Sequence, residues 1–183
     1  MTSSTAPNIY TQRRKNIVRT WAIILVFGLV VLGIAYGFAY VYQDISIVAI
    51  ALVVAIISNI TSYYFSDKIA LKTSGAIKAD RDNPAHLRVI RTTENMAITA
   101  GIPTPSVYII EDPAPNAFAT GRNAEHASVA FTTGLLEVLS DTELEGVVAH
   151  EVSHITNRDI LVGTIVVIMI GFVALMADLF MRM

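Results

Sequence analysis

The apolar residues of the chain gather in three long blocks. They span roughly residues 20–42, 45–65 and 160–177, and the last block continues to Met181. Each block is about as long as a helix that crosses a hydrocarbon core of about 30 Å. Since only Gln43 and Asp44 separate the first two blocks, the pattern predicts a transmembrane helical hairpin and, later in the chain, a third transmembrane helix.

Two of the blocks allow another interpretation. Basic residues precede the first block as in a signal peptide, but the block is too long for a signal sequence and no small-residue cleavage site follows it. The third block is the shortest and carries Asp178 near its end, so a buried helix of a soluble domain is the alternative there. A membrane span is the preferred interpretation of all three blocks.

Basic residues lie at only one end of the predicted hairpin. They precede the first span and follow the second one, whereas the turn at Gln43 and Asp44 contains neither Lys nor Arg. By the positive-inside rule, the N-terminal tail and the segment after Phe65 are expected in the cytoplasm.

Residues 66–159 have the pattern of a small α+β domain. Asn83, followed by a proline, is typical of a helix start, and this helix is expected to stop near Gly101. A capping-box pattern at 140–143 starts a second helix, which is expected to run to about Asn157. Between the two helices the pattern predicts a strand at 107–110, a loop at 111–121, a half-exposed strand at 127–132 and a short helix at 134–139.

The predicted fold class is therefore an α+β membrane protein. Its parts are a cytoplasmic tail (1–19), a transmembrane hairpin (20–65), a cytoplasmic domain (66–159) and a third transmembrane helix (160–183). Composition agrees with contact to the lipid bilayer, because 54% of the 183 residues are hydrophobic. The net charge of -2 argues against a nucleic-acid partner, and the absence of cysteine excludes disulfides and thiolate ligands.

The most informative spacing lies on the helix expected at 140–157. His150 and His154 are four residues apart, or about one helix turn, so they lie on one helix face and both imidazoles can reach a single metal ion. Zinc favours such nitrogen donors. Glu151 is placed to take a proton from the attacking water and to pass it to the leaving amine of a peptide. The spacing predicts two zinc ligands and one catalytic carboxylate.

Only six residues separate His154 from Ile160, or about 9 Å if the helix continues. The metal is therefore expected near the cytoplasmic membrane surface, where a membrane protein is a more natural substrate than a soluble one. Asn157, Arg158 and Asp159 lie between His154 and Ile160. They are expected either to anchor the end of the helix at the membrane surface or to support the metal site.

Other candidates rest on weaker patterns. A protease holds its substrate extended, and pairing it with an exposed edge strand is one way to do so. Val129, Ala130 and Phe131 are the candidates for that strand, although an ordinary sheet strand explains them equally well. The remaining histidines, His86 and His126, are expected to be surface residues rather than ligands.

Three segments of the chain carry recognisable motifs. They are Asn-Ala-Phe-Ala-Thr-Gly at 116–121, the segment 128–136 that ends in Thr-Thr-Gly-Leu-Leu, and Ala-His-Glu-Val-Ser-His-Ile at 149–155, followed by Asn157 and Asp159. Together with the preceding hairpin, these segments resemble the HtpX-type membrane metalloproteases, relatives of the CAAX prenyl proteases. The resemblance covers essentially the whole chain.

The resemblance implies a zincin-like endopeptidase of the bacterial cytoplasmic (inner) membrane, multi-pass, that acts in membrane-protein quality control and the stress response. It implies Zn²⁺ held by His150 and His154, with Glu151 catalytic. Membrane-protein or unfolded polypeptides are the implied substrates, and a homo-oligomer is considered. Asn116, at the start of the first motif, is a further candidate for substrate binding. A third zinc ligand, a Glu on a later helix, is also implied, and no residue up to Met183 matches it.

Two functions of different class follow. The first is a zinc-dependent membrane endopeptidase that is incomplete in this chain or borrows a ligand from a partner. The alternative is a non-catalytic, truncated relative that acts as a membrane binding or regulatory protein. Because two imidazoles alone hold zinc weakly, these 183 residues by themselves are expected to be inactive.

Overall fold

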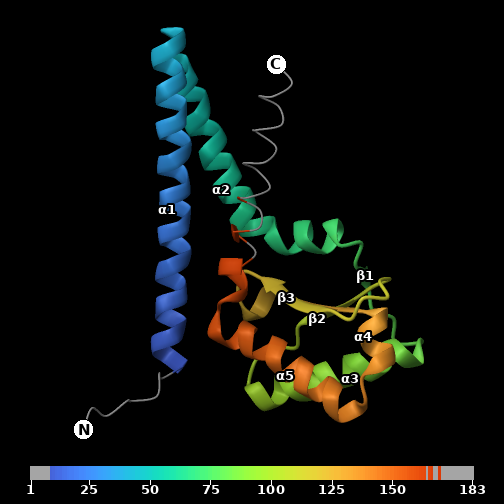
Figure 1. The fold of residues 1–183 in the computed structure, drawn as a ribbon. Coiled ribbons are helices and arrows are strands. Elements are labelled where there is room, and N and C mark those ends of the chain that lie inside the picture. Colours follow the sequence, from blue (N-terminus) through green and yellow to red (C-terminus); the bar gives the residue numbers. More distant parts are fainter. Residues whose placement is uncertain (1–8, 164, 167–168, 170–183) are drawn as a thin grey trace.

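The computed structural model describes residues 9–163, 165–166 and 169 (Figure 1). Two long helices precede a small domain with a four-stranded sheet. In chain order the elements are α1 (Ile9–Tyr42), α2 (Ser46–Thr73), β1 (Ile77–Lys78), α3 (Pro84–Ala100), β2 (Ser106–Ile110), β3 (Ala117–Gly121), the 3-10 helix η1 (Ala124–His126), β4 (Ala127–Thr132), α4 (Thr133–Val138) and α5 (Asp141–Asn157). The mixed α+β class predicted from the sequence is confirmed.

Helices α1 and α2 form the expected hairpin (Figure 1). Both are long and apolar enough to cross a membrane, and most of their large apolar side chains are exposed, which suits lipid better than water. At the turn, Gln43 adopts a positive φ of 54°, and the Asp44 carboxylate accepts hydrogen bonds from the backbone N–H and the hydroxyl of Ser46. Helix α2 runs beyond the expected end of the apolar block at Phe65, as far as Thr73.

A third helical stretch begins at Ile160. Most of the third transmembrane helix expected at 160–183 lies outside the described residues. The stretch does not simply continue α5, because Arg158 has a left-handed conformation with φ of 57° and ends that helix. The 9 Å estimate for a continuous helix therefore does not hold.

The sheet has the strand order β1-β2-β4-β3. Strands β2 and β4 are parallel, and the other two pairs are antiparallel. Two expectations for this region are wrong. Residues 117–121, expected in a loop, form strand β3 because they pair along their full length with β4. Strand β4, expected to be half-exposed, is buried at all six residues because it lies between β2 and β3.

Helices α3 and α5 lie beside one another below the sheet in the view of Figure 1. Val89 of α3, Phe131 of β4 and Leu144 and Ile155 of α5 are fully buried in the core between these layers. The predicted ends of α3 are confirmed. The Asn83 side chain accepts hydrogen bonds from the backbone N–H groups of the first turn. At the other end, Gly101 in the left-handed conformation caps the helix and its backbone N–H donates to the last carbonyls.

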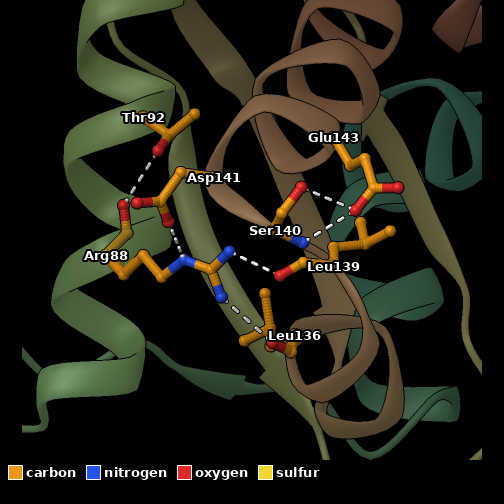
Figure 2. A network of polar contacts seen from close by, with 7 residues as sticks. All are labelled: Arg88, Thr92, Leu136, Leu139, Ser140, Asp141 and Glu143. Carbon is orange, nitrogen blue, oxygen red and sulfur yellow. Dashed lines mark hydrogen bonds and ion pairs between the residues drawn. The ribbon is translucent and has the colours of Figure 1, made fainter.

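The start of α5 is held by two sets of polar contacts (Figure 2). The predicted capping box is present: the N–H and hydroxyl of Ser140 donate to Glu143 Oε2 at 2.9 and 2.6 Å, and these bonds lower the pKa of the Glu143 carboxyl. Arg88 of α3 donates to Asp141 Oδ1 at 2.6 Å and to the carbonyls of Leu136 and Leu139 at 3.1 and 2.6 Å. The guanidinium thus joins α3, the end of α4 and the first turn of α5.

The other end of α5 is tied to the hairpin. Asn16, near the start of α1, donates from its side-chain amide to the carbonyl of Asn157 at 3.1 Å. Since this carbonyl is one of the last of α5 and has no partner within the helix, the bond satisfies it and fixes α5 against α1. Helix α5 is therefore held at both ends by residues distant in sequence.

We expect Arg88→Ala to loosen α5. Loss of the three hydrogen bonds is expected to cost about 1–3 kcal/mol, because charged donors make the stronger bonds and two carbonyls lose their partner. Hydrogen exchange of the α5 amides, followed by mass spectrometry in detergent, is then expected to accelerate about 10- to 100-fold. The matched control is Arg91→Ala, which removes an exposed guanidinium from the same helix. Equal exchange in the two variants would show that Arg88 does not hold α5.

Candidate metal centre

His150 and His154 lie one turn apart on α5, on the side away from the core. Their ring centres are 4.6 Å apart, the ring planes are nearly perpendicular at 89°, and the two Nε2 atoms face each other at 3.1 Å. Two imidazole lone pairs at this distance need a proton or a cation between them. Two nitrogens bound at about 2.0–2.1 Å to one tetrahedral zinc ion lie about 3.3 Å apart, so the pair fits such an ion.

Asp159 sets the orientation of His154. Because Arg158 turns the chain in its left-handed conformation, the carboxylate of Asp159 comes back toward α5, and its Oδ2 lies 3.0 Å from Nδ1 of His154. A carboxylate accepts the Nδ1 proton, which leaves the lone pair of Nε2 directed at His150 and the metal position. Of the two roles considered for Asp159, anchoring charge or support of the site, the geometry favours support.

Glu151 lies on the inner side of the histidine pair. It is 8% exposed and is the most buried carboxylate among the described residues. The carboxylate is not isolated in the core, because Glu151, His154 and Asp159 line one open cleft. An acid in this position is largely shielded from bulk water and lines the same cleft as His154.

The cleft has a volume of about 740 Å³ and is mostly apolar. Its walls come from five parts of the chain: the end of α2, strand β3, helix α5, the turn that follows α5 and the helical stretch that begins at Ile160. The lining residues are Ile69, Ala70, Thr73, Ser74, Ala117, Phe118, Ala119, Thr120, Glu151, His154, Asp159, Ile160 and Gly163. This size suits a segment of polypeptide rather than a single small ion.

The substrate-binding candidates lie differently from the expectation. Strand β4, which contains Val129, Ala130 and Phe131, is paired on both sides, so the exposed edge assigned to it is wrong. Among the described residues, β3 is the edge strand that lines the cleft together with His154. Asn116 precedes β3, and its backbone exchanges hydrogen bonds with Thr132. Strand β3 has a weak sequence pattern, because it is short and contains two alanines and a glycine.

The other two histidines have partners of their own. His86 Nδ1 accepts from the backbone N–H of Asp80, and His126 contacts Arg122 and Asn123. Within the described part of the chain, no group of three or more His, Cys, Asp and Glu side chains is arranged to hold a metal ion. His150 and His154 are therefore the metal donors that these residues offer, and the third ligand stays a prediction.

We expect Asp159→Asn to weaken zinc binding about 10- to 100-fold, because the amide no longer draws the Nδ1 proton of His154 into a fixed position. His154→Ala is expected to weaken binding further, since it removes a donor. Competition with a chromophoric chelator measures the zinc affinity of the detergent-purified protein. His86→Ala is the control and is expected to bind as the wild type does. Wild-type affinity in Asp159→Asn would sink the assignment.

Comparison with known proteins agrees with this geometry. Residues 83–182 match the model of Peptidase family M48. A "Protease HtpX homolog" of Caldanaerobacter subterraneus subsp. tengcongensis is 40% identical over 97% of the chain and 59% of its own length. Those of Thermoanaerobacter pseudethanolicus and Tropheryma whipplei (strain Twist) are 41% and 45% identical, each over 95% of the chain, and 58% and 59% of their own lengths are covered.

The chain thus spans about three fifths of the length of these relatives. The matched segment starts at the cap of α3 and includes β3, the strand beside it and the whole of α5, so it contains every residue of the candidate site except those from α2. The chain belongs to Peptidase family M48 and is similar to the HtpX proteases within it.

Proposed function

We propose that this chain provides the histidine pair and the proton-transferring carboxylate of a zinc-dependent membrane endopeptidase. The observation that carries the proposal is the convergence of the Nε2 atoms of His150 and His154 at 3.1 Å, with His154 and the buried Glu151 lining a cleft that edge strand β3 also lines. The M48 family and the HtpX relatives support the same class of reaction.

Zinc, when bound by His150 and His154, supplies the positive charge that polarises the scissile carbonyl and makes water more acidic. Glu151 is the group that moves the proton. Its carboxylate accepts a proton from the attacking water and then donates it to the nitrogen of the leaving amine, so it ends the cycle ionised as it began. Asp159 keeps His154 in one tautomer throughout.

The substrate is held by strand β3. It is the last strand in the sheet order β1-β2-β4-β3 and lines the cleft, and an extended polypeptide adds to such an edge strand by main-chain hydrogen bonds. The cleft wall on this side is formed by Ala117, Phe118, Ala119 and Thr120, and Asn116, the remaining substrate-binding candidate, directly precedes this strand. Val129, Ala130 and Phe131 belong to β4, which pairs with the inner side of β3, so they support this strand and do not touch the substrate.

The proposed location is the cytoplasmic side of a bacterial inner membrane. The charge pattern around the hairpin supports it, because Lys and Arg flank the outer ends of both helices and are absent from the turn. Membrane proteins and unfolded polypeptides are the proposed substrates, and quality control of membrane proteins is the proposed role. The third zinc ligand is proposed to be a carboxylate outside the described residues.

A non-catalytic binding or regulatory protein is the second candidate. It is favoured by one observation, that the described residues supply two metal donors and no third. Such a site binds zinc less tightly than a three-ligand site.

In protein that carries the third zinc ligand, we expect Glu151→Gln to reduce zinc-dependent cleavage of casein about 10²- to 10⁴-fold while zinc binding stays unchanged, because the amide occupies the same space but cannot accept the proton. The assay uses detergent-purified protein, with Glu145→Gln, an exposed position on the same helix, as the control. Tight one-to-one zinc binding with cleavage lost only in Glu151→Gln supports the endopeptidase. Weak zinc binding and no cleavage by the wild type would favour the non-catalytic alternative.

A further inference from the structure

The end of α2 forms one wall of the cleft that holds Glu151 and His154. Ile69, Ala70 and Thr73 line it from one side, opposite α5. Ile69 and Ala70 precede Thr73 by four and three residues, spacings that make side chains neighbours on a helix surface, so both adjoin Thr73 and the three form a strip. In Figure 1 the last turns of α2 leave the direction of the hairpin and run above the sheet, whereas α5 lies below it.

We propose that this strip, Ile69, Ala70 and Thr73, is a specificity wall that selects an apolar side chain of the bound polypeptide. The inference rests on the proposed function, since it takes β3 as the strand that pairs with substrate. It gives the membrane hairpin a role in substrate selection in addition to anchoring the domain.

Sheet geometry gives the wall its role. A polypeptide added to the free edge of β3 continues the sheet, and its side chains point alternately to the two faces. One set faces α5 with its histidines and glutamate. The other set faces the last turns of α2, because these lie across the opposite face and line the same cleft. Every second side chain of the substrate therefore meets the α2 strip.

The chemistry of the wall fits an apolar side chain. Ile69 is 37% exposed within the hollow, and Phe118 of β3 and Ile160 add apolar surface. The charged residues among the described lining are Glu151, His154 and Asp159, which belong to the catalytic side. Covering the exposed strip with a leucine-sized side chain removes apolar surface from water and is expected to strengthen binding about tenfold or more.

Two features hold the wall at the membrane surface and against β3. Phe65, the last of three consecutive aromatic residues, precedes Ile69 by four positions, or about 6 Å along the helix. The guanidinium carbon of Arg122, directly after β3, lies 5.4 Å from the ring centre of Tyr64, a cation–π contact that joins the edge strand to α2. The substrate class that follows is an extended, apolar segment next to a membrane span.

The test is peptide binding in a Glu151→Gln background, which prevents cleavage. The probes are two fluorescein-labelled decapeptides that differ only in a central Leu or Gly, and fluorescence anisotropy gives both affinities. We expect the reference protein to prefer Leu about tenfold or more. Ala70→Phe, which fills the cleft, is expected to remove this preference. Ile56→Phe, at an exposed position on the same helix and away from the cleft, is expected to keep it.

A second variant keeps the test decisive if Ala70→Phe does not fold. Ile69→Asn changes a partly exposed side chain and is expected to lower the preference for Leu at least severalfold. Equal affinity for both peptides in the reference protein, or an undiminished preference in the cleft variants, overturns the inference. Cleavage of casein by the wild type is measured in parallel. If the wild type cleaves casein but the cleft variants keep the preference for the Leu peptide, only the specificity wall is overturned. If the reference protein prefers the Leu peptide but the wild type does not cleave casein, the result supports the specificity wall and counts against the endopeptidase.

Discussion

The packing of α5 against the sheet and α3 decides which of its side chains reach the cleft. Leu144, Val148 and Ile155 are fully buried on one side, so the 3.6-residue repeat places His150 and His154 on the other. The helix is then fixed at both ends, by Arg88 at the first turn and by Asn16 at the last carbonyls. Everything proposed for the site depends on this rotation and position, because a metal ion tolerates little displacement of its donors.

The membrane hairpin and the site are physically continuous. Helix α1 bonds to the end of α5, and α2 supplies a wall of the cleft. A site built in this way opens next to the surface where the apolar part of α2 ends. Under the proposed function, the hairpin both anchors the site and, through Ile69, Ala70 and Thr73, shapes what enters the cleft.

Helix α5 was predictable because its signals are local. The capping box, the two histidines and the glutamate lie within 15 residues, and their geometry follows from the helix itself. Strand β3 was missed and the burial of β4 was wrong, because both depend on pairing between segments brought together only in the fold. The role of Asp159 depends on a left-handed arginine, which sequence does not predict, and the length of α2 was hidden by the polar residues after Phe65.

The most direct test of the account is the zinc K-edge absorption spectrum of the zinc-loaded, detergent-purified protein. Two imidazole nitrogens at about 2.0–2.1 Å are predicted in the wild type, with one of them lost in His150→Ala. Retention of the full imidazole signal in His150→Ala, or a wild-type spectrum without imidazole scattering, would contradict a metal centre formed by His150 and His154.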